Sequence, residues 1–161
     1  MARRTAARKR SLPTVVIGSD HGGYRTKQAL IRTLTAHKYT VVDIGDFGPN
    51  AHDDYPAYAH EVARAVAGDR TGKTKGVLIC GTGTGMSIAA NRHKGVRAAV
   101  AYDAYSARMA RHDNDANVVC LRGRRFSAKR TAQLVLRFLR TPFSGLPRHE
   151  RRIRKLDRGG L

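Results

Sequence analysis

The sequence predicts an α/β fold in which a five-stranded parallel sheet is covered by helices on both faces. Short apolar runs rich in β-branched residues recur five times, and segments with helical periodicity lie between them. The runs are apolar at every position rather than at alternate positions, which is typical of parallel strands buried on both faces. The alternation of strand and helix therefore predicts a Rossmann-like three-layer αβα sandwich.

The elements follow one another in a regular order. The predicted strands occupy residues 15–17, 41–42, 77–79, 98–101 and 118–121. The intervening helices are indicated by apolar residues at helical spacing, namely Leu30, Ile31 and Leu34; Tyr58, Val62 and Val66; residues 86–91; residues 104–111; and Leu134, Val135, Phe138 and Leu139. Asp103 and Ser127 stand where their side-chain oxygens can cap the last two of these helices.

The length of 161 residues fits one domain, and no second domain or internal repeat is visible. We expect a single domain over residues 14–161, preceded by a basic flexible arm at residues 1–13. Pro142, Gly145 and Pro147 interrupt the last long helix, after which a basic helical tail can form. Such a tail is free to reach a ligand or a second subunit.

The chain carries a formal net charge of +19, concentrated at its two ends. An excess of this size attracts nucleic acid, anionic membranes and phosphorylated small molecules alike, so charge alone does not choose among them. No apolar run is long enough to span a membrane, and we expect no membrane partner. The two cysteines show neither disulfide-scaffold nor zinc spacing, which favours a cytoplasmic protein, although the arginine-rich start also suits organelle targeting.

The most informative segment is ICGTGTGMSIAAN at residues 79–91, which follows the third predicted strand. Gly81, Gly83 and Gly85 allow close approach of the backbone to a ligand, and the amides before the next helix can bind an anion. The segment lacks the Gly-Lys-Ser/Thr of a Walker A loop, and its GxGxG spacing differs from the dinucleotide fingerprint. A nucleotide site is therefore disfavoured.

Cys80 stands at the mouth of this glycine-rich loop. Amide groups at the start of a helix favour the thiolate form of a nearby cysteine, which would make Cys80 a base or nucleophile. The alternative is that Cys80 is only a small buried hydrophobic residue. We expect Cys120 to be only a small buried hydrophobic residue, because it lies in a strand that no such loop follows.

The first strand ends in GSDHGGY, which places Asp20 and His21 at the strand tip before a helix. Ligands of open α/β sheets bind beyond the carboxyl ends of the strands, so both side chains are candidates for a binding site. The alternatives are a helix-capping role for Asp20 and an ordinary surface position for His21.

These motifs, together with DYP from Asp54, NDANV from Asn114 and RHERR from Arg148, resemble those of the type B ribose-5-phosphate isomerases. The wider family includes the galactose-6-phosphate isomerase subunits, and the resemblance extends from about Val15 to Leu156. It implies that an aldose phosphate and its ketose are interconverted through a cis-enediolate, without a metal ion or an organic cofactor.

The resemblance also implies roles for individual residues. Cys80 matches the base that removes the proton from C2 and returns it at C1. The loop residues that would hold the enediolate oxygens are Gly81, Thr82, Gly83, Gly85 and Ser87. The positions that match sugar contacts are Asp20, His21, Tyr55 and Asn114, and those that match phosphate-binding arginines are Arg124, Arg148 and Arg152.

The sequence departs from the family at Asp113, where family members usually carry the histidine that assists opening of the furanose ring. Asp113 could transfer the proton itself, the preceding His112 could reach the ring, or ring opening could be left to solvent. His112 could equally be a solvated surface residue. Because of this departure, the protein could also be a catalytically weakened relative of these isomerases that binds sugar phosphates as a sensor.

The resemblance implies assembly as a homodimer or homotetramer with an active site shared between subunits, and a phosphorylated sugar as the substrate. One alternative is an isomerase of a related C6 sugar phosphate. Another is a basic nucleic-acid-binding protein on the same scaffold, which is disfavoured because the six tyrosines and four phenylalanines form no interleaved basic-aromatic motif.

Overall fold

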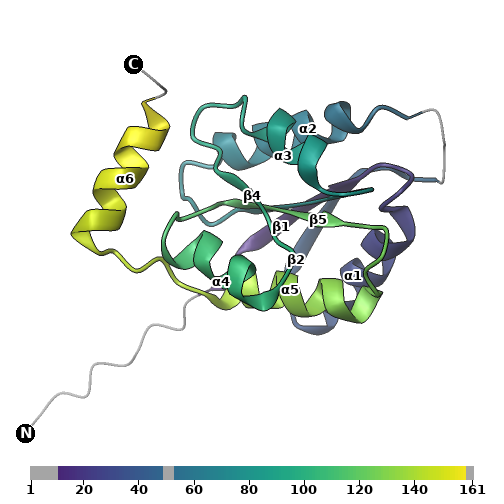
Figure 1. Cartoon of the computed structure of the whole chain (residues 1–161). Coiled ribbons are helices and arrows are strands. Elements are labelled where there is room, and N and C mark those ends of the chain that lie inside the picture. The colour runs from purple at the N-terminus through teal and green to yellow at the C-terminus, as the bar shows by residue number, and fades with distance from the viewer. Residues whose placement is uncertain (1–10, 49–52, 159–161) are drawn as a thin grey trace, which may run out of the picture.

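The computed structural model describes residues 11–48 and 53–158, in which strands and helices alternate (Figure 1). The strands are β1 (Thr14–Ser19), β2 (Thr40–Gly45), β3 (Lys75–Cys80), β4 (Ala98–Val100) and β5 (Val118–Arg122). The helices are α1 (Tyr24–Ala36), α2 (Tyr55–Gly68), α3 (Thr84–Ala90), α4 (Ala104–His112), α5 (Ala128–Arg140) and α6 (Pro147–Asp157). All five predicted strands and all predicted helices are present, with β4 ending one residue earlier than predicted.

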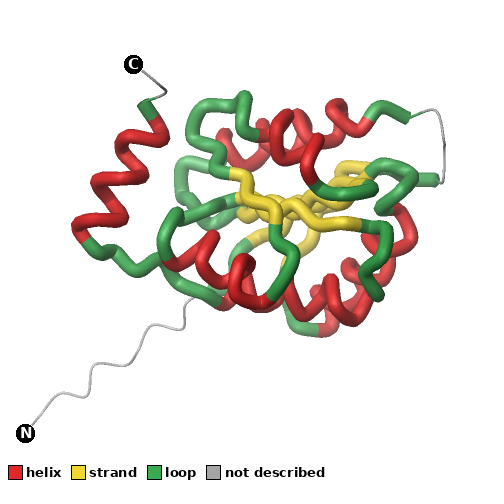
Figure 2. The backbone as a smooth tube through the Cα atoms, viewed as in Figure 1, coloured by secondary structure: helices red, strands yellow, loops and turns green. Residues whose placement is uncertain are grey.

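The strands form one parallel sheet in the order β2-β1-β3-β5-β4. Helices α1, α4 and α5 pack on one face, and α2 and α3 pack on the other, as Figures 1 and 2 show. Alternate residues of β3 serve the two faces, since Ile79 belongs to the first core cluster and Leu78 to the second. The predicted three-layer αβα architecture is confirmed.

The predicted helix caps are also present. The Asp103 side chain accepts a hydrogen bond from the amide of Ser106 at 2.7 Å, and the Ser127 hydroxyl accepts one from the amide of Arg130 at 3.2 Å. Each cap satisfies a backbone N–H that has no partner within the helix, which fixes where α4 and α5 begin.

Lys27 is an exception to the apolar core, because its side chain on α1 is fully buried. Its Nζ lies 2.5 Å from Oδ1 of Asp43 and donates to the carbonyl oxygen of Asp46 at 2.8 Å. These partners lie at the end of β2, so the buried ammonium ties α1 to that strand. Burial of a lysine is tolerated because a charge partner and a carbonyl replace the lost water.

The predicted helical tail is confirmed as α6, which projects from the α/β body beside the end of α4 (Figure 1). Most of its residues are exposed, and many of them are arginines. The first ten residues of the predicted N-terminal arm lie outside the described residues. Within the described part of the chain, no helix has the length and apolar character needed to cross a membrane.

Candidate active site

Three loops meet at the carboxyl-terminal edge of the sheet, where β1 and β5 flank β3. A side chain at Gly23 would place its Cβ 2.3 Å from the carbonyl oxygen of Ile79, and one at Gly123 would place it 2.4 Å from the carbonyl oxygen of Gly22. The amide of Gly123 donates to the carbonyl of Cys80 at 2.6 Å. Glycine at both positions therefore lets the three backbones come into contact around the end of β3.

Cys80 is the last residue of β3, and its side chain combines both of the environments that the sequence suggested. The residue is 5% exposed and packs in the apolar cluster between the sheet and helices α2 and α3. Its Sγ also accepts a hydrogen bond from the amide of Gly83 at 3.1 Å. Gly83 has a φ of 86°, a conformation that favours glycine, and this turn aims its N–H at the sulfur.

Cys120 differs from Cys80 although both side chains belong to the same apolar cluster. Cys120 is fully buried, and this burial raises the pKa of its thiol well above the ordinary value. The thiol of Cys120 therefore stays protonated at neutral pH. Its predicted role as a small buried hydrophobic residue is confirmed.

His21 is held by a carboxylate from a distant part of the sequence. Its Nδ1 lies 2.5 Å from Oδ1 of Asp53, and its backbone amide donates to Oδ2 of the same residue at 2.8 Å. The hydrogen bond to Asp53 raises the pKa of His21 above 6.5. The His21 imidazole is thus oriented, and it carries positive charge over a wider pH range than a free histidine does.

Asp20 lies beside this pair in the loop between β1 and α1. Its Oδ1 accepts a hydrogen bond from the amide of Gly23 at 3.0 Å, so it closes the turn that leads into α1. Burial is the main cause that raises the pKa of Asp20 above 3.8. Asp20 thus stabilises the turn but does not cap α1, whose N-cap is Gly23 without a side-chain cap bond, so the capping alternative was wrong. Asp20 also lies next to the His21–Asp53 pair.

Tyr55 comes from the first turn of α2 and reaches the glycine-rich loop. A Cβ on Gly85 would lie 2.7 Å from the Tyr55 ring, so the ring lies against this glycine. The tyrosine is 40% exposed, which leaves part of the ring and its surroundings accessible to a ligand. The loop after β3 and the start of α2 therefore share one surface.

The remaining predicted residues at this edge differ in their surroundings. The Arg124 side chain lies close to the backbone of Gly22 and Gly81, so a guanidinium borders the loops that follow β1 and β3. Thr82 is exposed, and its hydroxyl accepts a hydrogen bond from the amide of Thr84 at 3.3 Å. The Ser87 hydroxyl donates to the carbonyl of Ala98 at 3.2 Å, and this bond joins α3 to β4.

The other predicted residues lie at the opposite edge of the sheet. Asp113 comes five residues before β5 begins at Val118, whereas Cys80 pairs with Arg122 at the other end of that strand. At about 3.3 Å per residue, β5 alone separates the two edges by roughly 13 Å. The chain therefore divides the predicted site residues into two groups, of which the second comprises His112, Asp113, Asn114, Arg148 and Arg152.

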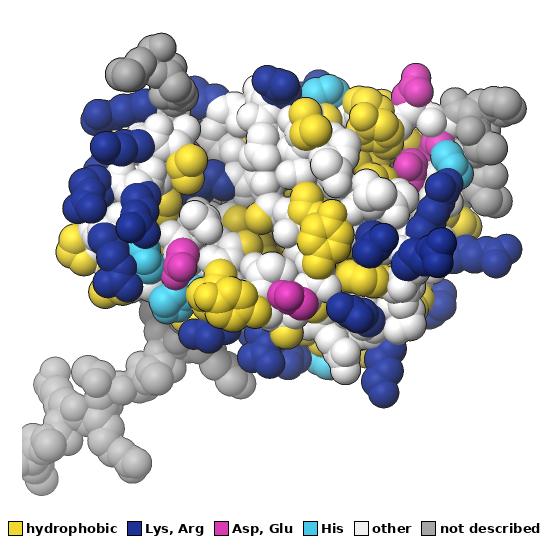
Figure 3. Space-filling model, viewed as in Figure 1, with side chains coloured by type: hydrophobic (Ala, Val, Ile, Leu, Met, Phe, Trp, Pro, Cys, Tyr) yellow, Lys and Arg dark blue, Asp and Glu magenta, His cyan; other side chains and the backbone are white. Residues whose placement is uncertain are grey.

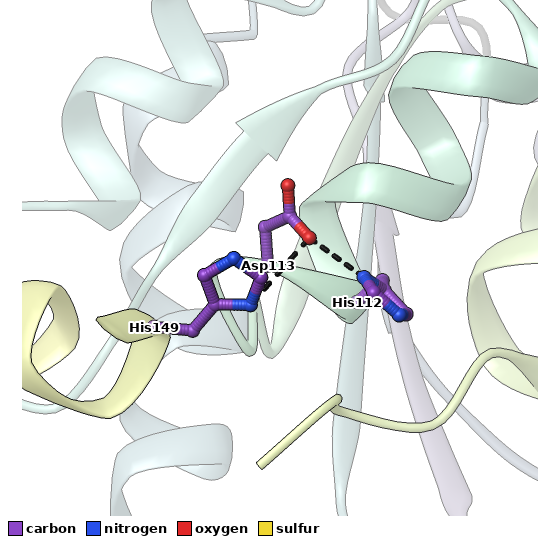
Figure 4. Close-up of side chains that lie close together, drawn as sticks. All are labelled: His112, Asp113 and His149. Atoms are coloured by element: carbon purple, nitrogen blue, oxygen red, sulfur yellow. Dashed lines mark hydrogen bonds and ion pairs between the residues drawn. The ribbon is translucent and has the colours of Figure 1, made fainter. Parts of the chain in front are cut away.

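In the second group, Asp113 lies between two imidazoles, as Figure 4 shows. Its Oδ1 lies 2.6 Å from Nδ1 of His112 and 3.6 Å from Nδ1 of His149. The hydrogen bond from His112 is the main cause that lowers the pKa of Asp113. The Asp113 carboxylate is therefore charged at neutral pH and is poorly suited to act as a general acid.

The sequence matches the model of the family described as Ribose/Galactose Isomerase over residues 15–156. The chain belongs to this family. The match extends from the second residue of β1 to the tenth residue of α6, so it includes both groups of predicted site residues.

Relatives within the ribose/galactose isomerase family cover most of this chain. The probable ribose-5-phosphate isomerase B of Mycoplasma pneumoniae is 38% identical over 88% of this chain and 91% of its own. Ribose-5-phosphate isomerase B of Escherichia coli is 37% identical over 86% of this chain and 91% of its own. The crystal structure of the Mycoplasma genitalium enzyme with bound ribulose-5-phosphate superimposes with a TM-score of 0.86, at 40% identity, over 90% of this chain and 94% of that one.

The structure brings together the family motifs at the first edge and adds two residues that the sequence did not reveal. Asp53 pairs with His21, and His149 pairs with Asp113. Asp53 precedes an identical aspartate in the sequence, and no local pattern distinguishes the two. His149 lies within the RHERR motif, but only the packing of α6 shows that it is buried.

Proposed function

We propose that this protein interconverts ribose 5-phosphate and ribulose 5-phosphate through a cis-enediolate, with Cys80 as the base. The observation that carries the proposal is the match to an enzyme whose crystal structure holds ribulose-5-phosphate, over nine-tenths of this chain. The contact between the Cys80 sulfur and the Gly83 amide supports the choice of base, because a neighbouring N–H stabilises a thiolate.

In the proposed reaction, the Cys80 thiolate takes the proton from C2 of the open-chain aldose. The electron pair of that C–H bond forms the C1–C2 double bond, and negative charge moves to the oxygen at C1. Cys80 then returns its proton to C1, while the proton of the C2 hydroxyl passes to the C1 oxygen and C2 becomes the ketone. Each atom is conserved, and the thiolate is regenerated.

The loop around Cys80 supplies the stabilisation that this charge requires. Backbone amides of the glycine-rich loop can donate to the enediolate oxygens without reorganising, because the close packing of the three loops fixes them. The oriented His21 and the Tyr55 ring border the same surface and are suited to sugar hydroxyls. The Arg124 guanidinium adds positive charge beside them.

The first experiment is a coupled assay of Cys80→Ala and Cys120→Ala on ribose 5-phosphate. We expect Cys80→Ala to abolish turnover while substrate binding persists, because the thiolate acts on the transition state. Cys120→Ala is the matched control, since it removes a thiol from the same apolar cluster. Full activity of Cys80→Ala would refute the proposed base. A parallel panel of C6 sugar phosphates tests the related isomerase activity.

We also propose that the protein works as a homodimer in which each active site takes its second group of residues from the partner. The roughly 13 Å of β5 between the two edges supports this, because Arg148, where the structure places it, lies at the edge opposite Cys80 of its own chain. An edge strand, β4, and exposed side chains of Ile88, Tyr102 and Tyr105 offer an apolar surface for a partner. Figure 3 shows hydrophobic side chains exposed among the Lys and Arg residues of this face.

Subunit complementation tests the shared site. Cys80→Ala and Arg148→Ala chains, each weakly active alone, are unfolded together and refolded as a mixture. With random pairing, half of the dimers contain one chain of each variant. In each of these dimers, one of the two sites combines an unaltered Cys80 with an unaltered Arg148, so we expect about a quarter of wild-type activity. Activity no greater than the sum of the separate variants would show that each site is built within one chain.

A further inference from the structure

Helix α6 is held on the body through few side chains. Among its residues, all of which the structure describes, only His149 is buried, with 4% of its side chain exposed. Near the far end of the helix, Asp157 forms an ion pair with Arg97 at 3.0 Å. Arg97 is largely buried and also pairs with Asp115, whereas Asp157 is 40% exposed. Within α6, His149 is therefore the one side chain that is buried against the body, and the pair with Arg97 adds a second contact at the far end.

The contacts of His149 determine where its proton lies. Nε of Arg148 lies 3.2 Å from Nε2 of His149, and an arginine can only donate. Nε2 must then accept, and in the neutral ring the proton lies on Nδ1. That nitrogen lies 2.7 Å from the Ser144 hydroxyl and 3.6 Å from Oδ1 of Asp113. Both nitrogens of the buried imidazole are thus engaged, each with the partner that its protonation state requires.

Asp113 completes this arrangement from the end of α4. Its charged carboxylate faces the N–H side of His149 and accepts from His112 at 2.6 Å (Figure 4). The loop before α6 is fixed to the same place, since the amide of Ser144 donates to the carbonyl of His112 at 3.0 Å. Asp113, the residue that departs from the family pattern, therefore lies beside His149, with its carboxylate 3.6 Å from the N–H side of the ring.

Two imidazoles and a carboxylate could also bind a divalent transition metal. Coordination through Nδ1 of His149 would move the ring proton to Nε2, where it would face the Nε–H of Arg148. Metal-bound histidines instead direct their second N–H at an acceptor. The arrangement around His149 thus fits the orientation of Arg148 better than it fits a metal ion.

We infer that His149 is a positioning residue: its Nε2 orients the Arg148 guanidinium, and its Nδ1 side fixes α6 against α4. The inference rests on the proposed function, in which Arg148 reaches the phosphate of a substrate bound mainly by the partner. Holding one nitrogen of Arg148 inside the protein leaves its two terminal nitrogens to face outward as a fork for a phosphate. Preorganisation of this kind lowers the entropic cost of binding.

The test compares His149→Gln with His149→Asn. The longer glutamine can place its amide oxygen near Nε2 and accept from Arg148, whereas asparagine can replace only the Nδ1 donor. We expect His149→Asn to raise KM for ribose 5-phosphate about tenfold with kcat within about twofold, and His149→Gln to stay within about threefold of wild-type KM. Arg151→Gln, an exposed change on the same helix, is the control and should leave KM unchanged.

The outcomes separate positioning from a purely structural role. An equal rise in KM in both His149 variants, with a lower kcat and a lower urea midpoint, would overturn the inference. A wild-type KM in both variants would also overturn it. If the unaltered protein shows no isomerase turnover, the proposed function fails, but calorimetric binding of inorganic phosphate still tests His149. Weaker phosphate binding by His149→Asn than by His149→Gln would support the inference, and equal binding would refute it.

Discussion

Gly123 is the position where a single added methyl group should disturb both the fold and the candidate active site. A Cβ there would lie 2.4 Å from the carbonyl oxygen of Gly22 and 2.8 Å from Cα of Gly23. Both neighbours are backbone atoms, so no rotamer change can relieve the clash. Gly123→Ala therefore forces the loop after β5 away from the loop after β1.

The size of the effect follows from these distances. The loops must part by at least about 0.6 Å before the carbon–oxygen contact reaches 3.0 Å, the shortest separation that real Cβ atoms show. Overpacking of this kind costs about 1–3 kcal/mol, and weakening the bond from the Gly123 amide to the Cys80 carbonyl costs about 1 kcal/mol more. We expect the free energy of unfolding to fall by about 2–4 kcal/mol. Because that bond positions the end of β3, kcat should fall on the order of tenfold.

Urea denaturation and the coupled isomerase assay measure these two quantities. Gly68→Ala is the control, since a Cβ at Gly68 meets no atom within 4 Å and the change should leave stability and kcat nearly unaltered. If Gly123→Ala changed the free energy of unfolding by less than about 0.5 kcal/mol and kept wild-type kcat, the three loops would not be in the close contact on which the site depends.

Three further results are expected. Lys27→Met leaves Asp43 without its charge partner, and urea denaturation should show a free energy of unfolding that is lower by about 3 kcal/mol. A decrease of less than about 1 kcal/mol would contradict this. Asp53→Asn removes the main cause of the raised pKa of His21, so NMR titration should show that pKa falling toward 6.5, and an unchanged value would show that the pair does not form in solution. Hydrogen bonds from Thr71 lower the pKa of Asp69 below its ordinary value. The ionised carboxylate therefore stabilises the fold above about pH 3.8, and this stabilisation is lost as the pH falls through the lowered pKa of the folded protein. Asp69→Asn should therefore destabilise the protein at pH 7, with the difference shrinking below pH 4 in thermal melts; a constant difference would exclude the ionised carboxylate as its source.

The strands and helix starts could be predicted because their signals are local. Buried parallel strands such as β3 are apolar at every position, and the capping oxygens of Asp103 and Ser127 act within three residues of their own position. The glycine-rich loop could likewise be predicted from the sequence, because the glycines that permit its backbone geometry lie next to Cys80.

Pairs between distant segments were not predictable in the same way. Asp53 and His21 are 32 residues apart, and the neighbouring Asp54 offers the same carboxylate in the sequence. The burial of His149 depends on where α6 comes to rest, which its exposed, arginine-rich sequence does not specify. Charge and hydrogen-bonding capacity are visible in a sequence, whereas their partners depend on how the chain is packed.

The sequence by itself determined the αβα architecture, the loop that carries Cys80 and the resemblance to a sugar-phosphate isomerase family, because periodicity and contiguous motifs are properties of neighbouring residues. Only the tertiary structure decided which carboxylate meets His21, what surrounds Asp113, and which predicted residues lie together. The physical reason is the parallel sheet, which gathers the carboxyl ends of all strands at one edge and leaves every residue that precedes a strand a full strand length away.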